Sequence, residues 1–237
     1  MIPKIIHYCW FGRGEKPKLA EKCIASWKKH CPDYEIIEWN EDNFDVNVSP
    51  YSKWCYENKK WAFLSDYARL VIIEKCGGFY FDTDVEIIRN LDELLSYEAV
   101  YGFENNDYVN TGEGFGSQAG HRVVRAMLLQ YNAITPDLNG NYKLVSCPVL
   151  NTLALNQFGL HHDGKRQSLE GAEVFPEEYF NPFDNATGRL NKTKNTFSIH
   201  WYAKSWINSF KVFRSILLRP VHRIFGVNCF AWLRKKK

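Results

Sequence analysis

No stretch of the 237 residues reaches the roughly 20 uninterrupted apolar residues that a membrane-spanning helix needs. The N-terminus also lacks the parts of a signal peptide, namely a basic start, a long apolar run and a small-residue cleavage site. Instead, Met1 leads directly into residues 2–8, which are apolar, rich in β-branched side chains and typical of a buried strand. We therefore expect a protein that is neither exported nor threaded through a bilayer and that acts in the cytoplasm.

The seven cysteines are too irregularly spaced to form a cysteine-based framework. Their number is odd, they lie far apart, and no C-x-x-C pair occurs among them. This spacing argues against a zinc site or a thiol redox motif. We expect reduced thiols in a reducing compartment.

Acidic residues are missing from the C-terminal part of the chain. All 27 Asp and Glu residues lie in residues 1–184, whereas residues 185–237 contain 12 of the 30 Lys and Arg residues. Charge of one sign that is confined to one segment predicts a separate partner for that segment.

Residues 210–237 alternate bulky apolar residues with basic ones and end in three lysines. Such a segment can lie on the inner face of an anionic plasma membrane as a peripheral contact. The alternative is a helix pair that packs on the rest of the protein and leaves its basic end in solvent. Nucleic acid is not expected as a partner, because no recognition fold surrounds the basic residues. Pro220 and Gly226 interrupt the pattern, which predicts at best two short helices.

The rest of the chain has the alternating pattern of an α/β domain. Strand-like residues 2–8 are followed by a helical pattern, with apolar residues three and four apart, and then by a second strand. After a polar loop comes another helical stretch, which Gly77-Gly78 ends. We see no internal repeat and no low-complexity segment. The expected helices cover residues 18–30, 61–75, 121–133 and 149–157, and the further strands cover residues 34–39, 79–81, 100–104, 108–111 and 196–201.

Asp82-Thr83-Asp84 lies directly after the expected strand at residues 79–81. In open α/β sheets, ligands bind at the carboxyl ends of the strands. Two carboxylates at this position can supply hard oxygen ligands to a divalent cation. A cation held there can neutralise the charge that develops on a departing diphosphate. The tripeptide alone is a weak signal, since a solvated acidic loop has the same composition.

The surrounding sequence strengthens the interpretation. The run W-A-F-L-S-D-Y-A-R-L at residues 61–70, continued by G-G-F-Y-F-D-T-D at residues 77–84, resembles the DXD sugar-binding region of glycosyltransferase family 32. The opening I-P-K-I-I-H-Y-C-W-F-G at residues 2–12 is similar to the first strand of the same family. The run S-I-H-W at residues 198–201 is also similar to the sequences of this family. The family includes bacterial capsular-polysaccharide transferases and a yeast α-1,6-mannosyltransferase, and is related to the glucosylating domain of the large clostridial toxins.

The resemblance implies a GT-A-like α/β domain with a mixed central sheet, over residues 1–206. Residues 207–237 would then form a basic helical appendage. It also implies a retaining transferase that uses a nucleotide sugar together with Mn²⁺ or Mg²⁺. Among the nucleotides we prefer uridine, with guanosine as the alternative, by analogy only.

The resemblance assigns roles to residues around the acidic pair. Asp82 and Asp84 would bind the metal and, with Asp66 and Arg69, form the catalytic set. Asp66 and Arg69 are three residues apart on a helix and share a face, so that a simple ion pair remains the alternative to contact with the donor sugar. Thr83 would take part in donor binding.

Further donor-binding residues are expected outside that run. Trp10 follows the first strand, where an aromatic ring could stack on the nucleotide base. His7 is either a donor ligand or a core residue, and His200 either a third metal ligand or a structural histidine. Ser205 and Trp206 match a pair that closes over the diphosphate.

The Asn- and Gly-rich residues 104–116 could form a loop that lines a polar sugar pocket, with Asn110 or Glu104 near the anomeric carbon. The alternative is a flexible surface loop. We assign no catalytic nucleophile.

The sequence therefore predicts a glycosyltransferase that acts on a saccharide or lipid-linked saccharide acceptor in bacterial surface-polysaccharide synthesis. The bacterial assignment rests on the lack of the membrane anchor that Golgi members of the family carry. The alternatives are a toxin-like protein glucosyltransferase and a catalytically silent module that binds nucleotide sugars. A hydrolase of nucleotide sugars is a weaker alternative.

Overall fold

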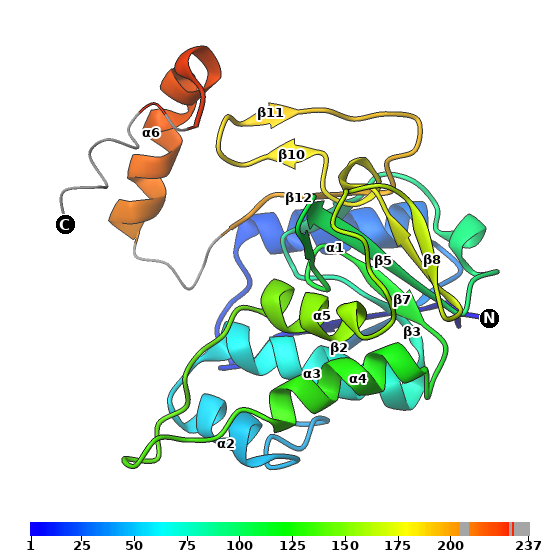
Figure 1. Ribbon diagram of the computed structural model, residues 1–237, viewed down its shortest axis with the longest axis vertical. Helices are drawn as coiled ribbons and strands as arrows, with labels where there is room; N and C mark the ends of the chain where they lie inside the picture. The colour runs from blue at the N-terminus through cyan, green and yellow to red at the C-terminus, as the bar shows by residue number, and fades with distance from the viewer. Residues whose placement is uncertain (204–208, 228, 230–237) are drawn as a thin grey trace.

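The computed structural model describes residues 1–203, 209–227 and 229, which fold around an 8-stranded sheet (Figure 1). One short strand, β6 (Tyr108–Val109), lies outside the main path of the sheet and pairs with β5. The other strands follow one another across the sheet in the order β2 (Glu35–Trp39), β1 (Ile5–Cys9), β3 (Gly78–Tyr80), β7 (Phe115–Ser117), β5 (Ala99–Asn105), β9 (Ala172–Phe175) and β8 (Gln167–Leu169).

The sheet contains both parallel and antiparallel pairs. β1 runs parallel to both β2 and β3, while β7 runs antiparallel to β3 and to β5. β5 and β9 are again parallel. The mixed central sheet expected from the sequence is therefore confirmed. Two small antiparallel pairs complete the strands, one formed by β4 (Val85–Ile87) with β12 (Ser198–His200) and the other by β10 (Phe183–Asp184) with β11 (Arg189–Leu190).

Helices cover both faces of the sheet, as Figure 1 shows, with α3, α4 and α5 on one side and α1 on the other. Each side has its own buried apolar cluster. Single-turn 3₁₀ helices occur at Asp92–Leu94 and Glu177–Tyr179. The α-helices are α1 (Lys18–His30), α2 (Pro50–Glu57), α3 (Trp61–Cys76), α4 (Arg122–Asn132), α5 (Cys147–Asn156) and α6 (Ser209–Phe225).

Two of these helices position the site. α1 buries Cys23 and Trp27, and the Trp27 indole N–H donates to the Val85 carbonyl at 2.8 Å, which attaches α1 to β4. α3 ends at Gly77, whose φ of 66° is a conformation that favours glycine. This ending turns the chain directly into β3 and so delivers the residues that follow β3 to the edge of the sheet. Both helices were expected, α1 from its apolar spacing and α3 from its length, its helix-forming residues and the Gly77-Gly78 stop.

Other expectations were wrong. The polar loop expected before residue 61 contains α2, which Ser49 and Ser52 cap reciprocally and Pro50 begins. β8 and β9 were missed altogether. Within its described part, the basic tail forms one helix that continues through Pro220, where a break was expected, and Gly226, with a φ of 77°, follows its end. Side chains of α6 on both sides of Pro220 contact residues 185–188. We attribute the continuity of the helix to these contacts.

Within the Asn- and Gly-rich segment only residues 105–108 are exposed, so most of the segment is not a surface loop. Residues 109–117 are all buried, and the segment includes β6 and the start of β7. All seven cysteines are free thiols, as expected. Within the described residues, no helix has the length and apolar character needed to cross a membrane.

Candidate metal centre

Asp82 and Asp84 lie on a turn that connects β3 to β4. The backbone N–H of Asp82 donates to the Gly112 carbonyl at 3.0 Å, and the Val85 N–H donates back to the Asp82 carbonyl at 3.0 Å. The turn is thereby fixed between the buried segment around Gly112 and the start of β4. Both carboxylates consequently occupy defined positions at the end of β3.

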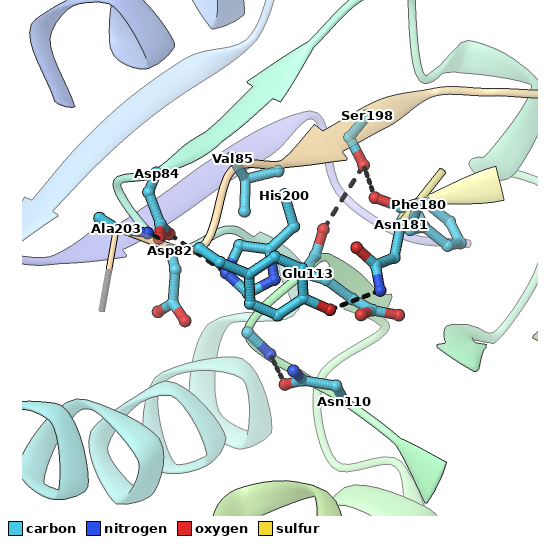
Figure 2. Close-up of polar contacts among 12 residues, drawn as sticks. Asp82, Asp84, Val85, Asn110, Glu113, Phe180, Asn181, Ser198, His200 and Ala203 are labelled. Carbon is cyan, nitrogen blue, oxygen red and sulfur yellow. Dashed lines mark hydrogen bonds and ion pairs between the residues drawn. The ribbon is translucent and has the colours of Figure 1, made fainter. Parts of the chain in front are cut away.

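His200 joins this acidic pair from a distant part of the sequence. It ends β12, and its register partner on β4 is Val85, the residue next to Asp84. One ligand atom from each of Asp82, Asp84 and His200 can be chosen so that all three lie within 4.8 Å of one another. The His200 Nε2 atom is 3.4 Å from Asp84 Oδ1. Figure 2 shows the three side chains converging, two from the turn and His200 from β12.

The donor set suits a divalent cation. Carboxylate oxygens are hard ligands, and imidazole nitrogen is a common ligand of transition-metal ions. His200 is buried, and its Nδ1 atom has no hydrogen-bond partner in the described part of the chain. Two carboxylates together with a histidine that has a polar atom left unsatisfied therefore fit a bound cation.

The electrostatics of the three residues differ. Burial raises the pKa of Asp82 above its usual range, against the opposing charge of Arg69. Burial would also raise the pKa of Asp84. The charge of His200 and hydrogen bonds, including one from the Ala203 N–H at 2.6 Å, outweigh this effect, so that the pKa of Asp84 is lowered. Burial would lower the pKa of His200, and Asp84 reverses that effect. Asp84 and His200 thus form an ion pair when His200 is protonated.

Arg69 fixes Asp82 from behind. Its side chain is only 1% exposed, and its Nη2 atom lies 2.8 Å from Asp66 Oδ1 and 2.9 Å from Asp82 Oδ1. The guanidinium also lies 4.7 Å from the centroid of the Tyr80 ring. The pair with Asp66 is therefore one arm of a buried network that includes the metal centre. The guanidinium itself is buried, whereas the Asp82 side chain keeps 30% of its surface exposed, so the network reaches solvent at Asp82.

Gly112 leaves room for this arrangement. A β-carbon at this position would lie 2.9 Å from Arg69 Nη1 and would collide with Asp82 Oδ2. Asn110 forms a tight turn with Gly112, since its Oδ1 atom accepts the Gly112 N–H at 2.7 Å. The absence of a side chain at residue 112 is thus what allows Asp82 and Arg69 to meet beneath the turn.

Comparison with known proteins identifies the family of the segment that carries the two aspartates. Residues 17–101, which include Asp66, Arg69, Asp82 and Asp84, match the family described as "Glycosyltransferase sugar-binding region containing DXD motif". Residues 17–101 therefore carry the DXD sugar-binding region of a glycosyltransferase. The resemblance to glycosyltransferase family 32 noted in the sequence is confirmed.

A curated relative matches part of this chain. Inositol phosphoceramide mannosyltransferase 3 of Schizosaccharomyces pombe is 33% identical over 106 residues. The match covers 41% of this chain and 28% of the relative, so the chain spans well under two thirds of that protein. The match gives no information on the rest of the relative.

Two solved structures resemble this chain in fold. The PaToxG glycosyltransferase superposes with a TM-score of 0.50 at 17% identity, over 66% of this chain and 69% of that one. A glycosyltransferase involved in the glycosylation of the major capsid of PBCV-1 superposes with a TM-score of 0.51 at 11% identity, over 90% and 100% of the two chains. At these identities the likeness concerns the fold alone, and it confirms the expected GT-A-like α/β architecture.

His7 lies outside the metal centre of the transferase. It is fully buried, its Nε2 atom lies 2.9 Å from the Gly77 carbonyl, and its Nδ1 atom accepts the Trp39 indole N–H at 3.0 Å. Burial lowers its pKa to about 4. Because both ring nitrogens are used within the protein, the structure places His7 in a structural position beneath Gly77-Gly78.

Trp10 lies at the sheet edge in a separate hollow of about 220 Å³, which Arg13, Lys16 and Glu41 also line. The Trp10 indole N–H donates to the Gly14 carbonyl at 2.6 Å, and Lys16 lies 5.6 Å from the centroid of the indole. A partly exposed indole at the end of β1 has the location expected of a base-stacking residue.

The remaining donor-binding candidates differ in exposure and in contacts. Thr83 is partly exposed between the two aspartates, whereas Asn110 is 7% exposed and is engaged with Gly112 and with the Cys147 thiol. Ser205 and Trp206 lie outside the described residues.

Sequence reasoning named Glu104 but missed the polar residues that gather with it behind His200, namely Asn181, Tyr202 and Glu113. Asn181 donates to the Tyr202 hydroxyl at 2.6 Å, and that hydroxyl lies 3.4 Å from Glu104 Oε1. Glu113 is fully buried nearby, and neither of its carboxylate oxygens has a hydrogen-bond partner among the described residues. Burial and the charges of Glu104 and Glu177 raise the pKa of Glu113 well above its usual range. No local pattern marks these positions, because they converge only when β5, β12 and the segment around Asn181 pack together.

Proposed function

We propose that this protein is a metal-dependent, retaining glycosyltransferase that moves a sugar from a nucleotide sugar to a saccharide or lipid-linked saccharide. The observation that carries the proposal is the convergence of Asp82, Asp84 and His200 within 4.8 Å of one another, inside a GT-A-like fold. We prefer a uridine nucleotide as the donor. Bacterial surface-polysaccharide synthesis is the proposed setting.

The cation proposed for this centre is Mn²⁺, with Mg²⁺ as the alternative. Mg²⁺ is usually bound by oxygen ligands, so the nitrogen ligand offered by His200 favours Mn²⁺. When bound, such a cation stabilises the negative charge of the departing diphosphate. Asp82, Asp84 and His200 are the residues that would hold it.

The chain's own residues have distinct roles in the proposed reaction. Arg69 holds Asp82 in place, and the Ala203 N–H does the same for Asp84. The acceptor hydroxyl attacks the anomeric carbon on the face from which the diphosphate leaves, so that one carbon–oxygen bond forms as another breaks. The hydroxyl proton leaves with the diphosphate. Retention is proposed from the family resemblance.

A lipid-linked acceptor draws support from the curated relative. The name of the Schizosaccharomyces pombe protein describes mannosyl transfer to a phosphoceramide, which is a lipid. We propose that the acceptor here is likewise attached to a lipid, as a lipid-linked saccharide, and that the protein lies on the inner face of the plasma membrane. The intact cluster of Asp82, Asp84 and His200 argues against a catalytically silent module.

The test is donor consumption across a panel of UDP- and GDP-sugars, with Mn²⁺, with Mg²⁺ and without metal. We expect one donor to be consumed only with metal, and Asp84→Ala to reduce the rate by at least about 100-fold, since even outer-shell changes cost 10- to 100-fold. Asp163→Ala is the matched control, because Asp163 pairs with Lys165 on the surface. A thermal melt of each variant checks folding.

Three results would contradict the proposal. If donor binding ignores both metal and Asp84, the acidic pair is structural. If turnover accelerates only with a protein acceptor, and not with saccharides or glycolipids, the protein is a toxin-like glucosyltransferase. Donor loss that no acceptor accelerates would indicate a hydrolase.

A further inference from the structure

Helix α6 exposes the apolar side chains that an amphipathic helix normally buries. Four of them lie on one side, because positions 213, 216, 217 and 224 recur at helical spacing. Their exposed fractions are 59% for Phe213, 46% for Ile216, 60% for Leu217 and 75% for Ile224. Pro220, also exposed, lies in the middle of the same stripe. We call these five residues the α6 stripe.

Polar contacts attach the other side of α6 to the segment between β10 and β11. Arg219 donates to the Asn185 side chain at 3.0 Å, and Arg223 donates to the Thr187 carbonyl at 2.6 Å. The guanidinium of Arg219 also lies 5.3 Å from the centroid of the Phe183 ring. Figure 1 shows α6 beside this hairpin at the periphery of the protein. The helix is therefore held by hydrogen bonds while its apolar stripe faces away from them.

The charge around the stripe has a single sign. At about 100° of rotation per residue, Arg214 and Arg223 lie on opposite flanks of the stripe. Residues 185–237 contain no acidic residue at all. A surface on which exposed apolar side chains are bordered by basic ones, with no acidic residue, complements an anionic lipid surface.

We propose that the α6 stripe docks this protein on anionic membranes, with α6 lying in the plane of the headgroups. In this orientation the apolar side chains enter the boundary between headgroups and acyl chains, and Arg214 contacts lipid phosphates. The inference stands on the exposure and charge of α6 and not on the transferase activity. It is consistent with the proposed lipid-linked acceptor, which would be presented at the same surface.

The test is cosedimentation of the full chain with vesicles of phosphatidylcholine alone or mixed with phosphatidylglycerol. We expect binding to the mixed vesicles only, weakened by added salt because exposed charges are screened. The double substitution Phe213→Ser with Ile224→Ser should reduce partitioning by about tenfold or more, because it removes two large apolar groups. Leu129→Ser is the matched control, since Leu129 is 63% exposed on α4, away from α6.

A second substitution separates charge from apolar contact. Arg214→Glu should weaken binding to the mixed vesicles while the α6 stripe stays intact. Donor consumption with a soluble acceptor should be unchanged in all these variants, so that failure of the membrane inference is distinguishable from failure of the proposed function.

Three outcomes would overturn the inference. The first is equal binding to both kinds of vesicle, and the second is unchanged binding by the double variant. The third is a stripe substitution that alters only the oligomeric state in sedimentation velocity, which would show that a second copy of the chain covers the stripe.

Discussion

The aromatic ring of Tyr202 stacks on the imidazole of His200, with 4.1 Å between the ring centroids and 27° between the planes. Tyr202 adopts a φ of 53°, a conformation that costs energy for a non-glycine residue. Its hydroxyl is held by Asn181 at 2.6 Å. The stack and the Asp84 contact together fix the orientation of His200, the one proposed metal ligand that comes from β12.

We expect Tyr202→Ala to weaken Mn²⁺ binding by about tenfold, in the range seen when groups that orient metal ligands are removed. Tyr202→Phe keeps the ring and removes only the hydroxyl, so it should bind Mn²⁺ more tightly than the alanine variant. The measurement is a titration with Mn²⁺ alone, followed by electron paramagnetic resonance of the free ion. Equal affinities in the wild type and both variants would show that the stack does not position His200.

Gly112→Ala should disable the metal centre without altering any ligand. The added methyl group would occupy the space of Asp82 Oδ2 and approach Arg69 Nη1. Asp82 must then move, and we expect Mn²⁺ affinity to fall by about tenfold or more. Gly14→Ala is the control, because a β-carbon there meets nothing within 4 Å. Wild-type affinity in Gly112→Ala would show that the Asp82 carboxylate has freedom to shift.

Glu113 should make the protein less stable as the pH rises. Its pKa is raised in the folded state by burial, whereas in the unfolded chain it titrates near the ordinary value of about 4.3. Between these two pKa values the folded state binds one proton more than the unfolded state. This carboxyl therefore lowers the free energy of unfolding by about 1.4 kcal/mol per pH unit over that interval.

The measurement is urea denaturation of metal-free protein from about pH 5 to pH 8, because this range starts just above the unfolded pKa of glutamate. Glu113→Gln should gain stability relative to the wild type as the pH increases. Glu21→Gln, at an exposed position on α1, serves as the control and should show no such trend. Parallel curves for wild type and Glu113→Gln would mean that Glu113 is already ionised and paired in the folded protein.

The local sequence was sufficient for the elements with a strong period and clear ends. The apolar spacing of residues 18–30 and the Gly77-Gly78 stop predicted α1 and α3, since helix formation depends on contacts between near neighbours. It was insufficient for α2, because the helix has only eight residues and the spacing of Tyr51, Trp54 and Cys55 covers little more than one turn. β8 and β9 were missed because they acquire their strand character from pairing with distant strands.

By itself the sequence determined the DXD turn, because Asp82 and Asp84 need only the strand before them to reach the edge of the sheet. Only the tertiary structure decided the rest of the centre. His200 reaches the aspartates because β12 pairs with β4, Arg69 meets Asp82 because Gly112 leaves room, and His7 lies beneath Gly77-Gly78. The physical reason is that these contacts join residues far apart in the chain, and their geometry is set by strand register and close packing rather than by local propensity.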